Sequence, residues 1–459
     1  MFMKLYNTKS RTIEDFVPIN DKVVTMYACG PTVYGYTHIG HMRKYIGDDV
    51  LRRTLSLLGY EVKHVMNVTD VGHLTGDRDE TGEDKMEKGA KKESKTVWDI
   101  AQFYTDYFNN TMSKVNVLSP TIQAKATDHI AEMITLNEQL AAKGFAYETD
   151  QALYFDTSKD SRYGELSGQK LSDKEVAVRD DVIIDPQKKH PADFSLWFKR
   201  VGKFADHAMY WPSPWGDGFP GWHIECSAMA MHYLGETIDI HTGGIDHIPV
   251  HHENEIAQSE CATGHDFVHY WVHYDFLLVN GEKMAKSKQN FYTVDDIVAH
   301  NIDPIATRLM FMQTNYRKPL NFTWESLDAA DQQLKKLQKF AAHHEAIGTI
   351  SDTYKNSFAE GLSDDLNTAK ALAIVWELLG DNSVSEADKW ATLLYFDQVL
   401  GLDLNGIEKF SISVEAQKLL EMRDTARAEK DFTQSDELRR QLEGLGYEVL
   451  DTATGTKLQ

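Results

Sequence analysis

The first third of the chain alternates between strand and helix patterns. A short apolar run from Val23 to Cys29 ends in Gly30-Pro31, which is the pattern of a strand followed by a turn. Helical spacing then covers roughly Gly40 to Leu58, and Val62 to Val68 has the pattern of the next strand. Strands that are joined by a helical crossover lie parallel in one sheet. The alternation therefore predicts an α/β fold with a parallel sheet.

This pattern stops near Ser119 and resumes after Pro220. Between them, short strand-like pieces such as Ala152 to Phe155 alternate with charged turns, which indicates an insertion into the sheet domain. Beyond about Asp328 the chain is all-helical, and a last small unit follows. We therefore expect five segments: residues 1–118, the first half of the sheet domain; 119–220, the insertion; 221–327, the second half; 328–405, a helical bundle; and 406–459, a small C-terminal unit.

Composition limits the class of protein. Hydrophobic residues make up 42% and charged residues 26%, which is ordinary for a globular chain and excludes a disordered or fibrous one. No apolar run approaches the ~18 residues of a membrane helix, and three cysteines cannot build a disulfide framework. With no apolar leader at the start, we expect a cytoplasmic protein without membrane contact. The net charge of −22 argues against a nonspecific DNA binder, although not against a partner bound at a local basic patch.

The segment His38-Ile39-Gly40-His41 lies at the predicted start of a helix, just after the first strand. A helix N-terminus presents unpaired N–H groups, and two imidazoles can donate hydrogen bonds to phosphoryl oxygens. Two neighbouring histidines are more often structural, but their place at a strand-to-helix turn makes a phosphate site equally plausible.

A second motif, Lys283-Met284-Ala285-Lys286-Ser287, follows a strand and the turn signal Asn280-Gly281. Two lysines three residues apart on a loop are usually a solvated surface. Beside a phosphate site, they could neutralise the charge of a transferring phosphoryl group.

Cys29, Cys226, His251 and Glu255 are all accepted types of zinc ligand. His251 and Glu255 lie four residues apart on a predicted helix, so they share a face. The chain has no CxxC pair, however, and spacing alone favours buried structural cysteines.

The turn Gly243-Gly244-Ile245-Asp246 follows another predicted strand. Its glycines permit a close approach of a nucleotide, and Asp246 could accept hydrogen bonds from ribose hydroxyls. A plain turn is an equally good interpretation of these residues.

Taken in this order, the motifs resemble those of the class I aminoacyl-tRNA synthetases. His38 to His41 is identical to the HIGH signature of that class, and Lys283 to Ser287 is similar to its KMSKS signature. Three longer segments resemble the cysteinyl-tRNA synthetase family: Cys29 to Tyr34, Gly221 to Met229, and His251 to Glu255. The resemblance runs from about Tyr27 through the last residues. It implies a Rossmann-like parallel-sheet catalytic domain with a connective insertion, then an all-helical domain and a small C-terminal anticodon-binding unit.

In that family a zinc ion is held by two cysteines, a histidine and a glutamate, at positions that fall on Cys29, Cys226, His251 and Glu255. The resemblance implies one such ion per chain, bound to the thiolate of the substrate cysteine. Pocket size alone separates small isosteres by only ~1–3 kcal/mol, whereas zinc selects sulfur directly. The resemblance also places Thr69 and Trp222 in the amino-acid pocket.

The implied activity is a cysteine–tRNA ligase reaction with L-cysteine, ATP, Mg²⁺ and tRNA(Cys). Cysteine is activated to cysteinyl-adenylate, and the cysteinyl group then passes to the 3′-terminal adenosine of the tRNA. By resemblance, His38, Gly40 and His41 contact ATP, Lys283 and Lys286 close over pyrophosphate, and Asp246 lies near the ribose. We expect a monomer.

Two other activities fit parts of this pattern. A cysteine ligase of mycothiol biosynthesis makes the same adenylate but lacks an anticodon-binding region, and the helical stretch Asp328 to Gln459 argues against it. A noncatalytic relative that binds tRNA or a metal would be expected to lose a HIGH histidine or a motif lysine, and this chain keeps both kinds of residue.

The chain departs from the family pattern at three places. Ala285 replaces a serine of the KMSKS signature, so that we expect altered loop behaviour rather than inactivity. The usual acidic-acidic-lysine continuation is absent after Asn67 to Asp70, and Asp246 to Val250 precedes the histidine pair where the family usually has proline directly before it.

Basic residues at helical spacing could form local stripes that contact tRNA phosphates, or they could be ordinary solvated helix faces. One group is formed by Lys335, Lys336 and Lys339, and the other by Arg423, Arg427, Lys430, Arg439 and Arg440.

Overall fold

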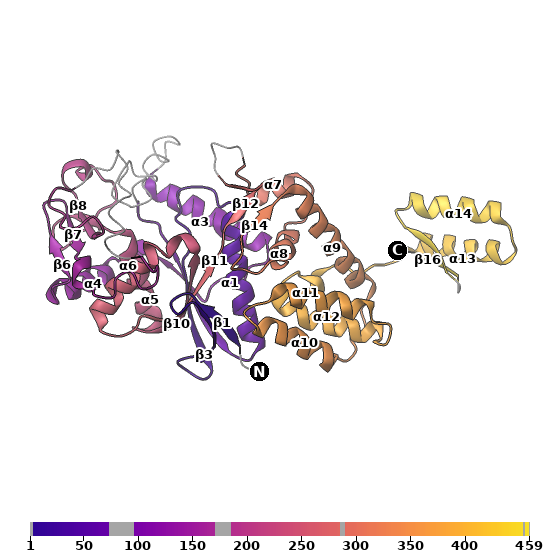
Figure 1. The fold of residues 1–459 in the computed structure, drawn as a ribbon. Coiled ribbons are helices and arrows are strands. Elements are labelled where there is room, and N and C mark those ends of the chain that lie inside the picture. Colours follow the sequence, from indigo (N-terminus) through magenta and orange to yellow (C-terminus); the bar gives the residue numbers. More distant parts are fainter. Residues whose placement is uncertain (1–2, 73–95, 170–184, 285–289, 453–454, 459) are drawn as a thin grey trace.

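The computed structural model describes residues 3–72, 96–169, 185–284, 290–452 and 455–458. Figure 1 shows a sheet domain flanked on one side by the insertion and on the other by the helical domain. The C-terminal unit stands apart at the far end of the molecule. The insertion and the helical domain therefore lie on opposite sides of the sheet domain, although the insertion interrupts that domain in the sequence.

The centre of the molecule is a five-stranded sheet in the order β11-β10-β3-β4-β5, and every neighbouring pair in it is parallel. Its strands are β3 (Val23–Ala28), β4 (Glu61–Val68), β5 (Ile122–Lys125), β10 (Ile238–Gly244) and β11 (Val268–Tyr274). The predicted parallel α/β fold is thus confirmed. The chain enters the insertion only after β5, and it returns to the sheet at β10.

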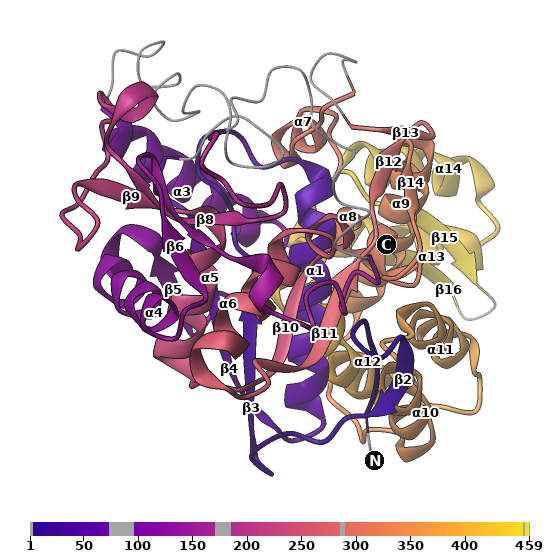
Figure 2. The same cartoon turned by 60° about the vertical axis from the view of Figure 1, so that its left-hand side comes forward.

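Helices cover both faces of this sheet (Figure 2). The connecting helices are α1 (Ile39–Leu57), α3 (Val97–Lys114), α5 (Trp222–Leu234) and α6 (His251–Thr263). Helix α3 begins at a capping box formed by Thr96 and Asp99, as the sequence predicts. Buried apolar residues of α5 and α6 share one core with β3 and β4, and residues of α1 belong to two other cores.

The insertion carries a separate antiparallel sheet in the order β6-β7-β8-β9. Its strands are β6 (Ala146–Glu148), β7 (Ala152–Phe155), β8 (Phe194–Lys199) and β9 (Gly218–Pro220), and α4 (Ile130–Ala142) packs on β6 and on α5. The N-terminal strands β1 (Lys4–Asn7) and β2 (Thr12–Asp15) form a hairpin, and this hairpin packs beside β11.

A small three-stranded sheet carries the second motif. It joins β12 (Leu277–Val279), β13 (Glu282–Lys283) and β14 (Leu320–Phe322). Between β12 and β13, Asn280 and Gly281 both have positive φ angles of 51° and 79°, as a type I′ hairpin turn requires. The turn predicted from Asn280-Gly281 is therefore confirmed.

The helical domain packs directly against the sheet domain. It consists of short α7 (Val294–Ala299) and α8 (Ile305–Met312), followed by α9 (Trp324–His343), α10 (Asp352–Ser363), α11 (Thr368–Gly380) and α12 (Glu386–Leu400). One continuous core joins residues of α1, α8, α9, α11 and α12, so that this part of the molecule is not an independent bundle. Among the described helices, none is long and apolar enough to cross a bilayer.

The C-terminal unit has its own small core. Helices α13 (Val414–Ala428) and α14 (Phe432–Gly444) pack on a hairpin of β15 (Val449–Thr452) and β16 (Gly455–Leu458). Its buried apolar residues, which include Ala416, Leu442 and Leu458, form a cluster separate from the others. The unit predicted after residue 405 is therefore a compact pair of helices on a hairpin (Figure 1).

Candidate active site

The strand order creates a cleft at the carboxyl ends of β3 and β10. From β3 the chain continues to β4 on one side, whereas from β10 it continues to β11 on the other side. The loops after the two strands therefore diverge, and ligands of open α/β sheets bind at such a point. A cleft of about 390 Å³ lies here, large enough for a small ligand. It is lined by residues of all four sequence motifs, including Cys29, His38, Asp246, His251 and Lys283.

The HIGH segment forms the start of α1. His38 is the N-cap residue, and its ring accepts a hydrogen bond from the backbone N–H of His41. The two rings stack with their centroids 3.6 Å apart. A Cβ atom at Gly40 would lie 2.9 Å from the His38 ring, so this arrangement requires glycine there. The helix start thus presents two imidazoles to the cleft, together with the backbone of Gly40.

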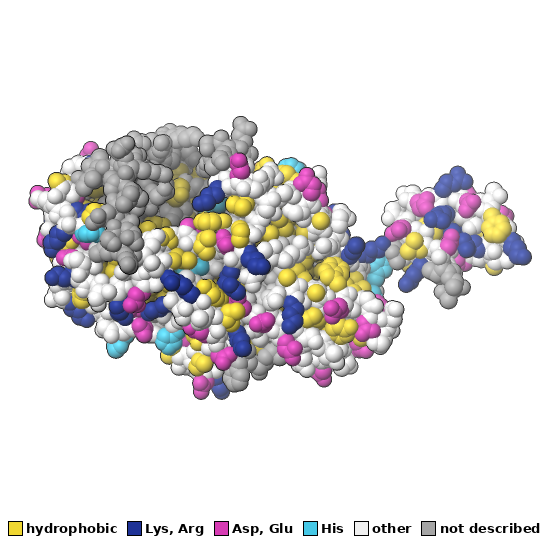
Figure 3. Space-filling view, in the orientation of Figure 1, with side chains coloured by type: hydrophobic (Ala, Val, Ile, Leu, Met, Phe, Trp, Pro, Cys, Tyr) yellow, Lys and Arg dark blue, Asp and Glu magenta, His cyan; other side chains and the backbone are white. Residues whose placement is uncertain are grey.

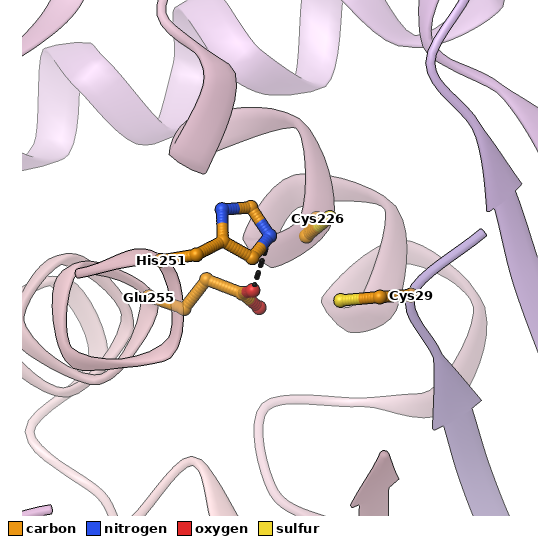
Figure 4. Close-up of side chains that lie close together, drawn as sticks. All are labelled: Cys29, Cys226, His251 and Glu255. Atoms are coloured by element: carbon orange, nitrogen blue, oxygen red, sulfur yellow. Dashed lines mark ion pairs between the residues drawn. The ribbon is translucent and has the colours of Figure 1, made fainter. Parts of the chain in front are cut away.

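Cys29, Cys226, His251 and Glu255 come together, as Figure 4 shows, and the first three of them line the cleft. Cys29 follows β3, Cys226 is on α5, and the other two are on α6. Each residue offers one ligand atom, these atoms all lie within 4.8 Å of one another, and all four residues are buried. Two sulfurs, one imidazole nitrogen and one carboxylate oxygen form a donor set that suits zinc. The residues therefore fit a metal ion.

The electrostatics of the cluster favour a cation. Burial alone would raise the pKa of Cys29, but hydrogen bonding to Cys226 and the neighbouring histidines lower it well below the usual range. The same hydrogen bond, together with burial, raises the pKa of Cys226. Burial opposes protonation of His251, yet Glu255, 2.9 Å from its Nε2 atom, and Cys29 raise its pKa to about 10. The cluster thus stabilises a positive charge, which here is the proton of His251.

Further buried histidines surround the cluster. The Nε2 atom of His252 lies 3.3 Å from the sulfur of Cys29, and its Nδ1 atom lies 2.7 Å from His273. His241 lies 2.9 Å from the carboxylate of Glu255, and His223 lies 2.9 Å from the Nδ1 atom of His251. Such contacts fix the orientation of metal ligands. Cys29, His241, His252 and Glu255 form a second group with ligand atoms within 4.8 Å of one another.

Thr69 and Trp222 both line the cleft beside the cluster. Thr69 is buried, and its hydroxyl donates a hydrogen bond of 3.0 Å to Glu225 and accepts one of 3.0 Å from Asn67. The indole ring of Trp222 stacks on His251 at a centroid distance of 4.3 Å. Both residues predicted for the pocket therefore line the cleft, and Trp222 also contacts His251 of the ligand cluster.

Two further residues that the resemblance assigns to ATP binding and pyrophosphate also line the cleft. Lys283, at the end of β13, and Asp246, after β10, both line it. The Asp246 side chain is 60% exposed, so its carboxylate is open to a ligand. Ala285 and Lys286 lie outside the described residues.

Sequence reasoning missed three side chains that the structure brings to this site: Lys44, Glu225 and His252. Glu225 and His252 are direct neighbours of the predicted ligands Cys226 and His251, so their presence within the same motifs was an available signal. Lys44 lines the cleft from α1, one helical turn beyond His41. Nothing in the local pattern marks it, because a lysine on an amphipathic helix is normally solvated.

Comparisons with known proteins agree with this geometry. The family described as tRNA synthetases class I (C) catalytic domain matches residues 15–332, and the cysteinyl-tRNA ligase anticodon binding domain matches residues 411–457. The chain is 42% identical to a cysteine–tRNA ligase of Treponema denticola, with 99% of each chain covered. It is 44% identical to cysteine–tRNA ligase 1 of Burkholderia lata, and the matched region covers 100% of this chain and 97% of that relative.

Solved structures show the same fold at low identity. A methionyl-tRNA synthetase of Mycobacterium tuberculosis, in complex with methionyl-adenylate, matches with a TM-score of 0.56 and 16% identity over 83% of this chain and 90% of the other. The full-length relatives and both family matches agree with the cluster of two cysteines, a histidine and a glutamate in the cleft. The chain therefore belongs to the cysteinyl-tRNA synthetase family, the cysteine–tRNA ligases of class I.

Proposed function

We propose that this ligase activates L-cysteine with Mg²⁺-bound ATP and transfers it to the terminal adenosine of tRNA(Cys), with one zinc ion held by Cys29, Cys226, His251 and Glu255. When bound, the zinc ion would supply a soft Lewis-acid site that takes a thiolate in preference to a protonated hydroxyl. The buried ligand cluster, three of whose members line the cleft, is the observation that carries this proposal.

In the first step, a carboxylate oxygen of cysteine attacks the α-phosphorus of ATP. An oxygen–phosphorus bond forms to give cysteinyl-adenylate, and the bond to pyrophosphate breaks. The chain's own contribution is to position and neutralise charge, because no covalent enzyme intermediate is needed. His38 and His41, with the N-terminus of α1 and Gly40, would hold the triphosphate, and Lys283 and Lys286 would receive pyrophosphate. Asp246 would accept a hydrogen bond from the ribose.

Amino-acid recognition would come from the other end of the cleft. Thr69 and Trp222 stand beside the cluster and shape the space around a bound cysteine. In the second step, a ribose hydroxyl of the tRNA attacks the cysteinyl carbonyl, and AMP leaves. The anticodon would be read by the C-terminal unit, which matches an anticodon binding domain.

The structure limits how the basic residues of that end can take part. Arg423 is buried, and its guanidinium pairs with Asp451 at 2.8 Å, so it holds the hairpin rather than tRNA. Lys335 and Lys339 pair with Asp331 and Glu448. On the face shown in Figure 3, basic and acidic side chains are intermixed over the C-terminal unit. On this face, a tRNA contact would therefore involve individual exposed residues and not a continuous basic stripe.

The deciding experiment is transfer of labelled cysteine to bulk tRNA in the presence of ATP and magnesium, with serine in parallel. We expect charging with cysteine and none with serine. Cysteine-dependent ATP–pyrophosphate exchange without charging would support the adenylate site and contradict tRNA as the acceptor. Charging with serine at a similar rate would contradict selection by a metal-bound thiolate.

A further inference from the structure

Lys44 is a charged side chain in the cleft to which the proposed reaction gives no role. It lies on α1, three residues after His41, so that both side chains stand on the same side of the helix. Both residues line the cleft. Its side chain is only 12% exposed, and a lysine this deeply buried needs partners for its charge.

The ammonium group of Lys44 has two such partners. It donates a hydrogen bond to the backbone carbonyl of Cys29, and it forms an ion pair of 2.8 Å with Asp48. Asp48 is 1% exposed, and burial raises its pKa while the ammonium of Lys44 opposes that shift. The Cys29 carbonyl and the Asp48 carboxylate therefore hold the Lys44 ammonium at a fixed place in the cleft.

One donor of this ammonium group remains for a ligand. A lysine ammonium has three N–H donors, and the Cys29 carbonyl and the Asp48 carboxylate take two of them. Within the described part of the chain no acceptor takes the third, and the nearest aromatic partner is the ring of Tyr45, whose centroid lies 4.9 Å away. Because the residue lines the cleft, the remaining donor is available to an anionic group bound there.

The position of Lys44 defines which anion it meets. Its ammonium contacts the backbone of Cys29, whose sulfur belongs to the ligand cluster. His41 precedes Lys44 by one helical turn, and the N-cap residue His38 precedes it by about two. In cysteine, the carboxylate carbon is three bonds from the sulfur. When the sulfur of a bound cysteine lies at the cluster and its carboxylate faces the HIGH histidines, that carboxylate lies close to the ammonium group of Lys44.

We propose that Lys44 binds the α-carboxylate of the substrate cysteine and orients it toward the α-phosphate of ATP. This inference rests on the proposed metal-bound position of the substrate sulfur. A hydrogen bond from a charged donor to a carboxylate changes affinity by about 10- to 100-fold. Lys44 would therefore recognise the part of the amino acid that reacts, whereas the cluster recognises its side chain.

The test compares the binding of cysteine with that of cysteamine, which keeps the thiol and the amine but lacks the carboxylate. The variant combines Lys44→Met with Asp48→Asn, since Lys44→Met alone would leave a buried carboxylate without its cation. Lys143→Met is the matched control: Lys143 also donates to a backbone carbonyl, that of Ala262, but it does not line the cleft. Calorimetry on the zinc-loaded full-length proteins gives both affinities, and zinc content is measured for each protein.

We expect the preference for cysteine over cysteamine to fall by about 10- to 100-fold in the double variant, with cysteamine affinity and zinc content unchanged. The Lys143→Met control should keep the wild-type preference. Equal weakening of both ligands, or loss of zinc, would overturn the proposal and make Lys44 a support for Cys29. An unchanged cysteine affinity with weaker ATP binding would also overturn it, in favour of a phosphate contact. If the wild type bound serine as well as cysteine, the metal-site proposal would fail instead.

Discussion

At the scale of single residues, the site depends on groups whose charge is set by burial and by their neighbours. The lowered pKa of Cys29 brings negative charge into a buried place, and the raised pKa of His251 or a bound cation balances it. The chemistry of these side chains is therefore inseparable from their position.

Cys226→Ser removes one of the two thiolate ligands while it keeps the size of the side chain. We expect loss of zinc and a fall in cysteine-dependent pyrophosphate exchange of more than about 100-fold, the upper end of what losing an outer-shell partner costs. Circular dichroism should remain that of the wild type. Full exchange activity in a protein shown to be metal-free would contradict the zinc site.

His64 gives a prediction for stability against pH. Its ring is buried in β4 and has no hydrogen-bond partner among the residues that the structure describes. Burial, aided by Arg52 and Lys44, lowers its pKa to about 3. Between that value and the ~6.5 of an unfolded histidine, the unfolded chain binds the extra proton, so acidification favours unfolding. From pH 7 to pH 5 this residue should remove about 2 kcal/mol from the free energy of unfolding.

Urea denaturation of the wild type and of His64→Leu at pH 7, 6 and 5 checks this prediction. The difference between the two unfolding free energies should shift by about 2 kcal/mol across the series, to the relative advantage of the variant at low pH. A difference that stays constant with pH would show that His64 is not the group that titrates.

At the scale of elements, α1 joins the chemistry to the rest of the molecule. Its first turn carries the HIGH histidines, and its later turns carry Asp49, which pairs with Arg308 of α8 at 2.6 Å. Arg308 is fully buried and also donates to the backbone carbonyls of Leu400, Val115 and Asn116. One guanidinium thus ties α1 to α8, to the end of α12 and to the loop after α3.

Arg308→Met should therefore destabilise the protein strongly. It leaves Asp49 and three carbonyls without this partner, and loss of one member of a buried pair typically costs about 3–5 kcal/mol. Thermal unfolding measures the effect. Lys335→Met is the control, because Lys335 also pairs with an aspartate, Asp331, but its side chain is 55% exposed. This variant should change the free energy of unfolding by at most ~1 kcal/mol. Equal effects of the two variants would contradict the role of Arg308.

At the scale of the whole molecule, the cleft and the C-terminal unit lie in different places. The cleft lies between β3 and β10, whereas the C-terminal unit has a separate core at the far end of the molecule (Figure 1). A defect confined to that unit should therefore leave the cleft intact.

Arg423→Met tests this separation in the full-length chain. Arg423 bonds to Asp451 and Thr456, so it links α13 to both strands of the hairpin. We expect tRNA charging to fall through a higher KM for tRNA, while cysteine-dependent pyrophosphate exchange stays at the wild-type rate. Arg440→Met, which removes only an ion pair of a 71% exposed arginine, is the control for the fold of the unit. A parallel loss of exchange would show that the two ends are coupled.

Local rules determined most of the elements of this protein from the sequence. The helix predicted from roughly Gly40 to Leu58 agrees with α1 to within one residue at each end, the Thr96 capping box forms, and Asn280-Gly281 makes the hairpin turn. Each of these depends on residues within a few positions of one another, so the sequence pattern contains the interaction. The four metal ligands could be predicted only from the resemblance to a family, because their spacing in the sequence alone favours buried structural cysteines.

The tertiary structure alone decided which distant residues meet. The order β11-β10-β3-β4-β5 brings the ends of β3 and β10 together, and with them Cys29 and the residues of α5 and α6. Strand order depends on how whole layers pack, and no local pattern encodes it. The same reason explains Lys44 and Arg423, which have the pattern of surface charges in the sequence but are buried in the structure. Lys44 is enclosed by Asp48 and the backbone carbonyl of Cys29, and Arg423 by the C-terminal hairpin with Asp451.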